Sequence, residues 1–90
     1  MSDARSALTF QLSVKLFALL REQVGHAALT LELPVGTCVR DLAQHLRAAE
    51  PRLTPFLEVS RVAVNLAFAP PEQVLQPSDE VALIPPVGGG

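Results

Sequence analysis

Two stretches near the start of the chain alternate between hydrophobic and polar residues. Residues 10–16 alternate with period two, which predicts a strand with one apolar face. Residues 28–33 repeat the alternation, and Pro34 is expected to end this second strand because proline cannot donate to a sheet ladder. Between them, residues 18–24 are rich in helix formers and are followed by Gly25, a typical left-handed helix stop. The pattern therefore predicts a strand, a short helix and a strand.

The clearest helical pattern covers residues 38–49. Its apolar residues recur at spacings of three and four and form one stripe along the helix: Val39, Leu42, Ala43 and Leu46. We expect Thr37 to provide the N-cap, and Asp41 has the favourable sign for the helix dipole. Pro51 is expected to stop the helix, because the residue before a proline is pushed out of the helical conformation.

The second half of the chain predicts shorter elements. They are, in order, an irregular stretch, a strand, a brief edge strand, one helical turn and a last strand, over residues 51–60, 61–66, 67–69, 72–75 and 80–84. In the last strand the alternation places Val81 and Leu83 toward the core.

This order of elements predicts an α+β protein with a β-grasp arrangement, in which one main helix packs across one face of a mixed sheet. The first and last strands of such a fold lie parallel in the middle of the sheet, and the helix-bearing segment is long enough for the crossover that a parallel pair requires. We expect a flexible tail over residues 1–9, the β-grasp domain over 10–84, and an extended Gly-rich tail over 85–90.

The composition fits one small domain with an aliphatic core. The chain has 90 residues, of which 49% are hydrophobic and only 4% aromatic, so Leu, Val and Ala must build the core. The net charge is −2 with no basic run, and no apolar run reaches the roughly 18 residues of a membrane span. We therefore expect neither nucleic acid nor a membrane as a partner. Cys38 is the single cysteine, and residues 1–9 do not resemble a secretory signal, so we expect a cytoplasmic protein.

Side chains that could carry catalysis are few and scattered. Cys38, His26 and His45 match no zinc-binding spacing, and we expect no metal site. Cys38 lies near the predicted helix start, where the dipole can stabilise a thiolate, or it is simply a small half-buried residue. The glutamates are spread along the chain, with no pair placed on one face of one element. We therefore do not expect an independent enzyme.

The C-terminal residues combine a stiff base with a tip that lacks side chains. The last six residues are Pro85, Pro86, Val87, Gly88, Gly89 and Gly90. The two prolines favour an extended chain, so this segment could reach roughly 20 Å from the domain. A tip without Cβ atoms can enter a narrow channel in another protein, although the same residues would also suit a loose terminus.

An apolar patch beside this tail is expected to contact a partner, because exposed apolar patches mark such sites. Its candidate members are Ile84, Pro85, Pro86, Val87, Phe17 and Phe68. The alternative for Ile84 is that it only covers the second face of the sheet.

Several segments resemble the ubiquitin-like sulfur carriers, and most closely the small subunits of molybdopterin synthase. The resemblance covers about residues 10–90. The segments that carry it are 14–18, 20–22 with Gly25, 37–42, 62–65 and 79–87 ahead of the glycines. The run 79–90 is its most specific part.

The resemblance implies a carrier that works through the C-terminal carboxylate of Gly90. An adenylyltransferase similar to ubiquitin-activating enzymes would use ATP to adenylate this carboxylate, and a sulfur donor protein would convert it into a thiocarboxylate. The tail would then enter the large subunit of molybdopterin synthase and give sulfur to a pyranopterin precursor, forming the dithiolene of the molybdenum cofactor. The assembly implied is a heterotetramer of two small and two large subunits, and the chain would hold no permanent cofactor.

Three other interpretations stay open at this point. The same tail would serve a sulfur carrier for thiamin, cysteine or methionine biosynthesis or for tRNA thiolation. The chain could also be a β-grasp binding module with an inert tail. The third alternative is a redox enzyme that depends on Cys38.

Overall fold

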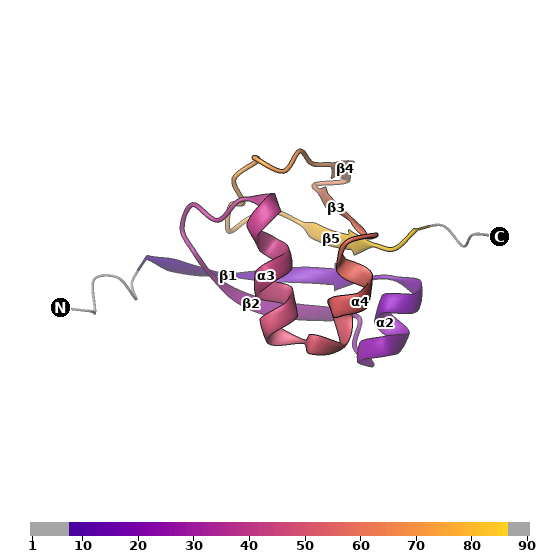
Figure 1. The fold of residues 1–90 in the computed structure, drawn as a ribbon. Coiled ribbons are helices and arrows are strands. Elements are labelled where there is room, and N and C mark those ends of the chain that lie inside the picture. The colour runs from indigo at the N-terminus through magenta and orange to yellow at the C-terminus, as the bar shows by residue number, and fades with distance from the viewer. Residues whose placement is uncertain (1–7, 87–90) are drawn as a thin grey trace.

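The computed structural model describes residues 8–86 and places five strands in one mixed sheet (Figure 1). The strands are β1 (Thr9–Leu16), β2 (Ala28–Pro34), β3 (Arg61–Val64), β4 (Ala67–Phe68) and β5 (Val81–Ile84). The helical segments are α2 (Ala18–Val24), α3 (Val39–Ala49), a 3₁₀ turn (Pro51–Leu53) and α4 (Thr54–Leu57). Within residues 8–86, these helices are all too short to span a membrane.

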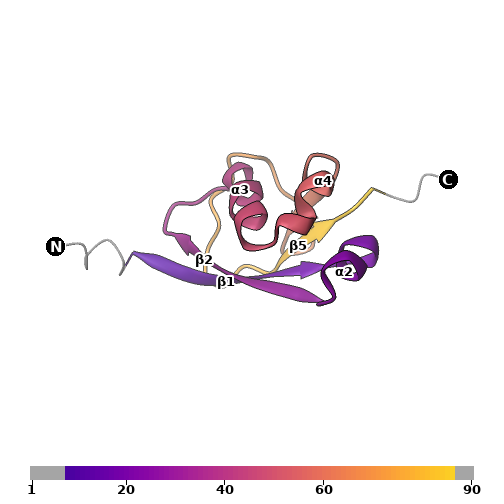
Figure 2. The ribbon, with the colours of Figure 1, turned by 60° about the horizontal axis from the view of Figure 1, so that its bottom comes forward.

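The order of the strands confirms the predicted β-grasp arrangement. Across the sheet the order is β2-β1-β5-β3-β4. The first and last strands of the chain, β1 and β5, are parallel neighbours in the centre, and the other strand pairs are antiparallel. The crossover between these two strands carries α3 and α4, which lie on the same side of the sheet (Figure 2).

Aliphatic side chains fill the space between the sheet and α3. Val14 of β1 is paired with Val81 of β5, and both side chains are fully buried. Leu83 also faces inward, as its alternation with Ala82 predicts. The buried stripe of α3 consists of Val39, Leu42 and Leu46. Since burial of one such side chain stabilises the fold by about 1.5–3 kcal/mol, this layer is the main source of stability.

The N-terminus of α3 is capped by backbone carbonyls rather than by a side chain. Cys38 is the N-cap residue, and its side chain makes no capping hydrogen bond. Thr37 donates its hydroxyl to the carbonyl of Pro34 at 2.6 Å, so the predicted Thr37 cap is wrong. The amide of Val39 donates to the carbonyl of Gln73 and the amide of Arg40 to the carbonyl of Pro71, at 2.9 Å each. A segment distant in sequence therefore supplies the acceptors that a capping side chain would otherwise provide.

Two segments of the second half differ from the sequence expectation. Residues 51–60 are not irregular, because they form the 3₁₀ turn and α4 and bury Leu53 and Leu57 in the core. Residues 72–75 do not form a helical turn, and Val74 instead makes an isolated bridge with the start of α3. Contacts with α3 decide the conformation of both segments, and local sequence carries no periodic signal of such contacts.

The two ends of the chain are described only in part. Strand β1 begins at Thr9, and the carbonyl of Leu8 accepts a hydrogen bond from the amide of Val35 at 2.8 Å. Residues 1–7 lie outside the described residues, so the N-terminal tail stays a prediction there.

Candidate functional site

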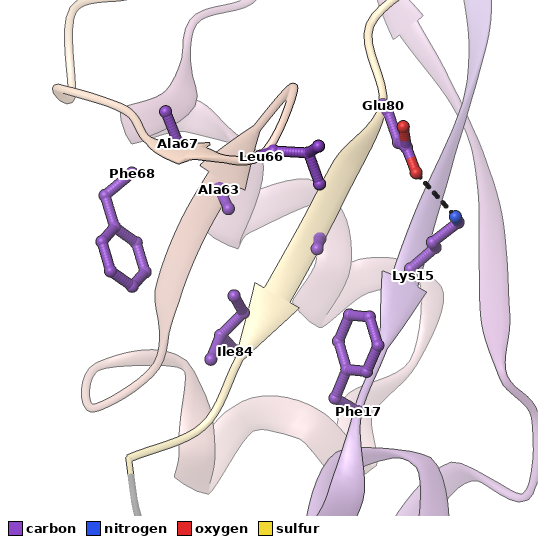
Figure 3. A pocket seen from close by; sticks show the side chains of 9 residues that line it. Lys15, Phe17, Ala63, Leu66, Ala67, Phe68, Glu80 and Ile84 are labelled. Carbon is purple, nitrogen blue, oxygen red and sulfur yellow. Dashed lines mark hydrogen bonds and ion pairs between the residues drawn. The ribbon is translucent and has the colours of Figure 1, made fainter.

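The sheet face opposite α3 carries an open depression with a floor of small side chains (Figure 3). Lys15 of β1, Ala82 of β5 and Ala63 of β3 are aligned neighbours, and Phe68 of β4 ends the row. Two methyl side chains in the middle of this row leave a hollow of about 510 Å³. The register of four strands thus creates the depression.

Four large apolar side chains surround this floor: Phe17, Leu66, Phe68 and Ile84. The exposed fractions are 44% for Phe17, 52% for Phe68 and 90% for Leu66. Apolar side chains that gather on a surface while remaining this exposed mark sites of interaction. The depression and its four walls, which we call the docking face, suit the apolar side chains of another protein.

Phe17 lies on the docking face because it continues the alternation of β1, in which Lys15 lines the depression and Leu16 faces the core, and the reversal of the chain toward β2 begins only after it. Phe17 has extended backbone, and Ala18 follows in the left-handed region with φ of 49°. A left-handed residue other than glycine costs on the order of 1 kcal/mol. Leu16 and Leu20, on either side of the reversal, are both buried and hold the junction in place.

A tight hairpin between β3 and β4 places Leu66 at the edge of the depression. A strand over 61–66 is wrong at its end, because Asn65 and Leu66 have φ of 54° and 72°. Two successive left-handed residues are typical of a type I′ hairpin turn, which favours asparagine. The side-chain amide nitrogen of Asn65 donates to the Asp79 carboxylate at 3.0 Å, and the side-chain oxygen of Asn65 accepts from the backbone amide of Glu80 at 2.9 Å. These bonds tie the turn to the start of β5.

The charged groups around the docking face are already engaged within the chain. The Lys15 ammonium lies 2.7 Å from the Glu80 carboxylate. The hydrogen bond from Lys15, together with its positive charge, lowers the pKa of Glu80 below its ordinary value. On the other side, the Arg61 guanidinium lies 3.7 Å from the centroid of the Phe68 ring. The apolar walls therefore dominate what this face can bind.

The structure brings together part of the site that the sequence predicts. Phe17, Phe68 and Ile84 line one depression, although they come from three distant parts of the chain. Directly after Ile84, Pro85 is half-buried and Pro86 is exposed. The remaining predicted site residues lie outside the described residues, and their roles stay predictions: Val87, Gly88, Gly89 and Gly90.

The sequence analysis missed the hairpin turn beside the docking face and the small residues of its floor. The turn residue Asn65 carries a usable signal, because asparagine tolerates the left-handed region and favours turns. Leu66 carries no such signal, and its placement depends on the turn. The floor residues Ala63 and Ala82 become neighbours only through the register of β3 with β5.

The remaining chemical groups do not form a reactive cluster in the described part of the chain. Cys38 is buried, and its thiol donates to the carboxylate of Asp41 at 3.2 Å. Among residues 8–86, no three side chains of His, Cys, Asp or Glu gather as metal ligands would. Of the described residues that line the depression, Lys15 and Glu80 are the titratable ones, and they pair with each other.

The strand order and the crossing helix define a β-grasp protein of the ubiquitin-like type, and solved structures agree. SAMP1 from Haloferax volcanii superposes with a TM-score of 0.78 at 28% identity, over 89% of this chain and 99% of that one. A chain from the complex of subunits 1 and 2 of the molybdopterin-converting factor of Helicobacter pylori gives a TM-score of 0.65. It is 22% identical, over 90% of this chain and 100% of that one.

The sequence assigns the chain more narrowly within this class. The ThiS family matches residues 14–90, and the chain belongs to this family. The molybdopterin synthase sulfur carrier subunit of Dictyostelium discoideum is 34% identical in an alignment of 83 residues that covers 89% of this chain and 96% of that protein. The resemblance to sulfur carriers noted in the sequence is therefore confirmed.

Proposed function

We propose that this chain is the sulfur carrier subunit of a molybdopterin synthase. The observation that carries the proposal is the similarity, over nearly the full length of both chains, to a relative that bears that name. The docking face supports it, because an apolar depression lies beside Ile84, after which the tail begins. We assign the sulfur to the C-terminal carbonyl of Gly90, carried as a thiocarboxylate.

The chemistry of a terminal carboxyl group explains the need for an activating partner. Its ordinary pKa of roughly 3.5 makes it an anion at neutral pH, and a carboxylate is a poor electrophile. An adenylyltransferase would join the Gly90 carboxylate to AMP from ATP and release pyrophosphate. Sulfur at the oxidation level of sulfide, delivered by a donor protein, would then displace AMP and leave the thiocarboxylate. The chain itself needs no resident cofactor for either step.

The tail and the docking face have separate tasks in this proposal. Gly88, Gly89 and Gly90 carry no side chains, so a narrow channel in the large subunit can accept them. The docking face, continued by Pro85, Pro86 and Val87, would hold the large subunit in place. The chain from Helicobacter pylori was solved in a complex of subunits 1 and 2, which supports a large-subunit partner. We place the assembly, a heterotetramer, in the cytoplasm.

An intact-mass measurement tests the first half of this proposal. The full chain is incubated with ATP, a sulfide source and the cognate adenylyltransferase. We expect its mass to rise by the difference between sulfur and oxygen. A chain that lacks Gly90 is the matched control and should keep its mass. An unchanged mass in the full chain, with an active adenylyltransferase, would contradict the carrier role.

The second half concerns the acceptor of the sulfur. The thiocarboxylate form is mixed separately with the large subunit and its pyranopterin precursor, and with the enzymes of thiazole formation, cysteine synthesis and tRNA thiolation. We expect loss of sulfur from the chain only with the large subunit. Transfer to another acceptor alone would assign the carrier to that pathway.

A further inference from the structure

Leu66 is an unusual residue for its place in the hairpin between β3 and β4. Its backbone is left-handed, with φ of 72°, although branched aliphatic residues avoid this region because their Cβ crowds the backbone. Its side chain is 90% exposed, more than any other large hydrophobic residue of the described chain. Leucine at this position is therefore unfavourable both for the backbone and for contact with water.

The fold does not require leucine here. Asn65 holds the turn. Its side chain makes hydrogen bonds to Asp79 and Glu80, and its backbone amide donates to the backbone carbonyl of Glu80 at 2.8 Å. Glycine or asparagine would suit the left-handed position better than leucine does. The Leu66 side chain extends over the edge of the depression toward β5 (Figure 3). A conformationally costly residue that projects an apolar side chain over a surface is best explained by a contact outside the chain.

We infer that Leu66 is an anchor residue for the large subunit that receives the tail, an assignment that rests on the proposed function. Residues 87–90 span at most about 14 Å when extended, so the receiving protein must come close to Pro86. Ile84, two residues before Pro86, is itself a wall of the depression. A partner at the tail is thus placed to cover the docking face, and Leu66, on the opposite wall, would enter an apolar pocket of that partner.

Removal of such an anchor should leave the thermal stability of the chain unchanged or higher, while it lowers the affinity for the large subunit. Leu66→Gly and Leu66→Asn both relieve the left-handed strain, so neither should lower the melting temperature, and a rise of a few degrees is expected. Both remove the buried aliphatic contact, so the dissociation constant of the complex with the large subunit should rise about tenfold. Val35→Ser is the matched control, because Val35 is also an exposed aliphatic residue of a turn but does not line the depression.

The experiment measures thermal unfolding of each full-length variant and its titration calorimetry with the purified large subunit. Weaker binding of both Leu66 variants at undiminished melting temperature, with Val35→Ser unchanged, supports the anchor. If wild type and both variants bind equally, the anchor is rejected while the proposed function stands. A lower melting temperature in both variants would show that Leu66 supports the fold, and would also reject the anchor. If the wild-type chain itself fails to bind, the proposed function fails, and the anchor with it.

Discussion

At the scale of single residues, Lys15 and Glu80 show how charges are kept at the edge of an apolar surface. Their ammonium and carboxylate groups pair at 2.7 Å, and about half of each side chain remains exposed. Exposed pairs are screened by water and salt, so this one adds little to the stability of the fold. Its more evident effect is to satisfy both charges within the chain, so that a partner covering the depression meets no unpaired charge there.

Substitution of Glu80→Gln should change how stability depends on pH. Because Lys15 lowers the pKa of Glu80 in the folded chain, the pair stabilises the fold above the ordinary pKa of 4.5. This contribution is lost as the pH falls through the lowered value, where the folded carboxylate takes up a proton. Urea unfolding at low salt should therefore show wild type slightly more stable than Glu80→Gln at about pH 7, with the difference shrinking steadily as the pH falls below 4.5.

The control for this titration is Glu58→Gln, which removes an exposed carboxylate that has no ion pair among residues 8–86. Its stability should differ little from that of wild type at about pH 7. The assignment would fail if the gap between wild type and Glu80→Gln widened on acidification.

At the scale of elements, periodic segments are predictable from sequence and segments fixed by distant contacts are not. The strands β1 and β2 and the helix α3 are each predicted from a periodic pattern that covers at least six residues, and each forms close to its predicted bounds. The 3₁₀ turn and α4 are too short for a period, and their buried leucines are set by packing on α3. For the same reason, the sequence locates Phe17, Phe68 and Ile84 but not Leu66, whose position depends on a turn that Asn65 fixes.

Leu53 provides a test of whether the segment after α3 belongs to the core. It lies in the 3₁₀ turn and is fully buried, so Leu53→Ala should lower the free energy of unfolding by about 2–5 kcal/mol. The control is Val59→Ala, which truncates an exposed side chain after the same segment and should cost less than about 0.5 kcal/mol. Chemical denaturation measures both. Equal effects of the two substitutions would mean that this segment does not pack as described.

At the scale of the whole molecule, the two faces of the sheet divide stability from recognition. One face packs on α3 and α4, whereas the other presents the docking face to its surroundings (Figures 2 and 3). Strand β5 serves both, because Val81 and Leu83 point into the core while Ala82 and Ile84 line the depression. The tail begins directly after this strand, so its starting point is fixed by the most central contacts of the fold.

This arrangement makes the reach of the tail a property of the whole molecule, which deletion of Gly88 can test. The deletion shortens the segment after the docking face by about 3.5 Å, while the face itself is unchanged. Affinity for the large subunit should stay within about threefold of wild type, whereas the rate of sulfur transfer should fall about 100-fold, because small misplacements of a reacting atom are that costly.

The control is Gly88→Ala, which keeps the length of the tail and should transfer sulfur at nearly the wild-type rate. The thiocarboxylates are prepared chemically, which bypasses the adenylyltransferase, and single-turnover transfer is measured. If the shortened chain transferred sulfur at the wild-type rate, the docking face would not set the position of Gly90.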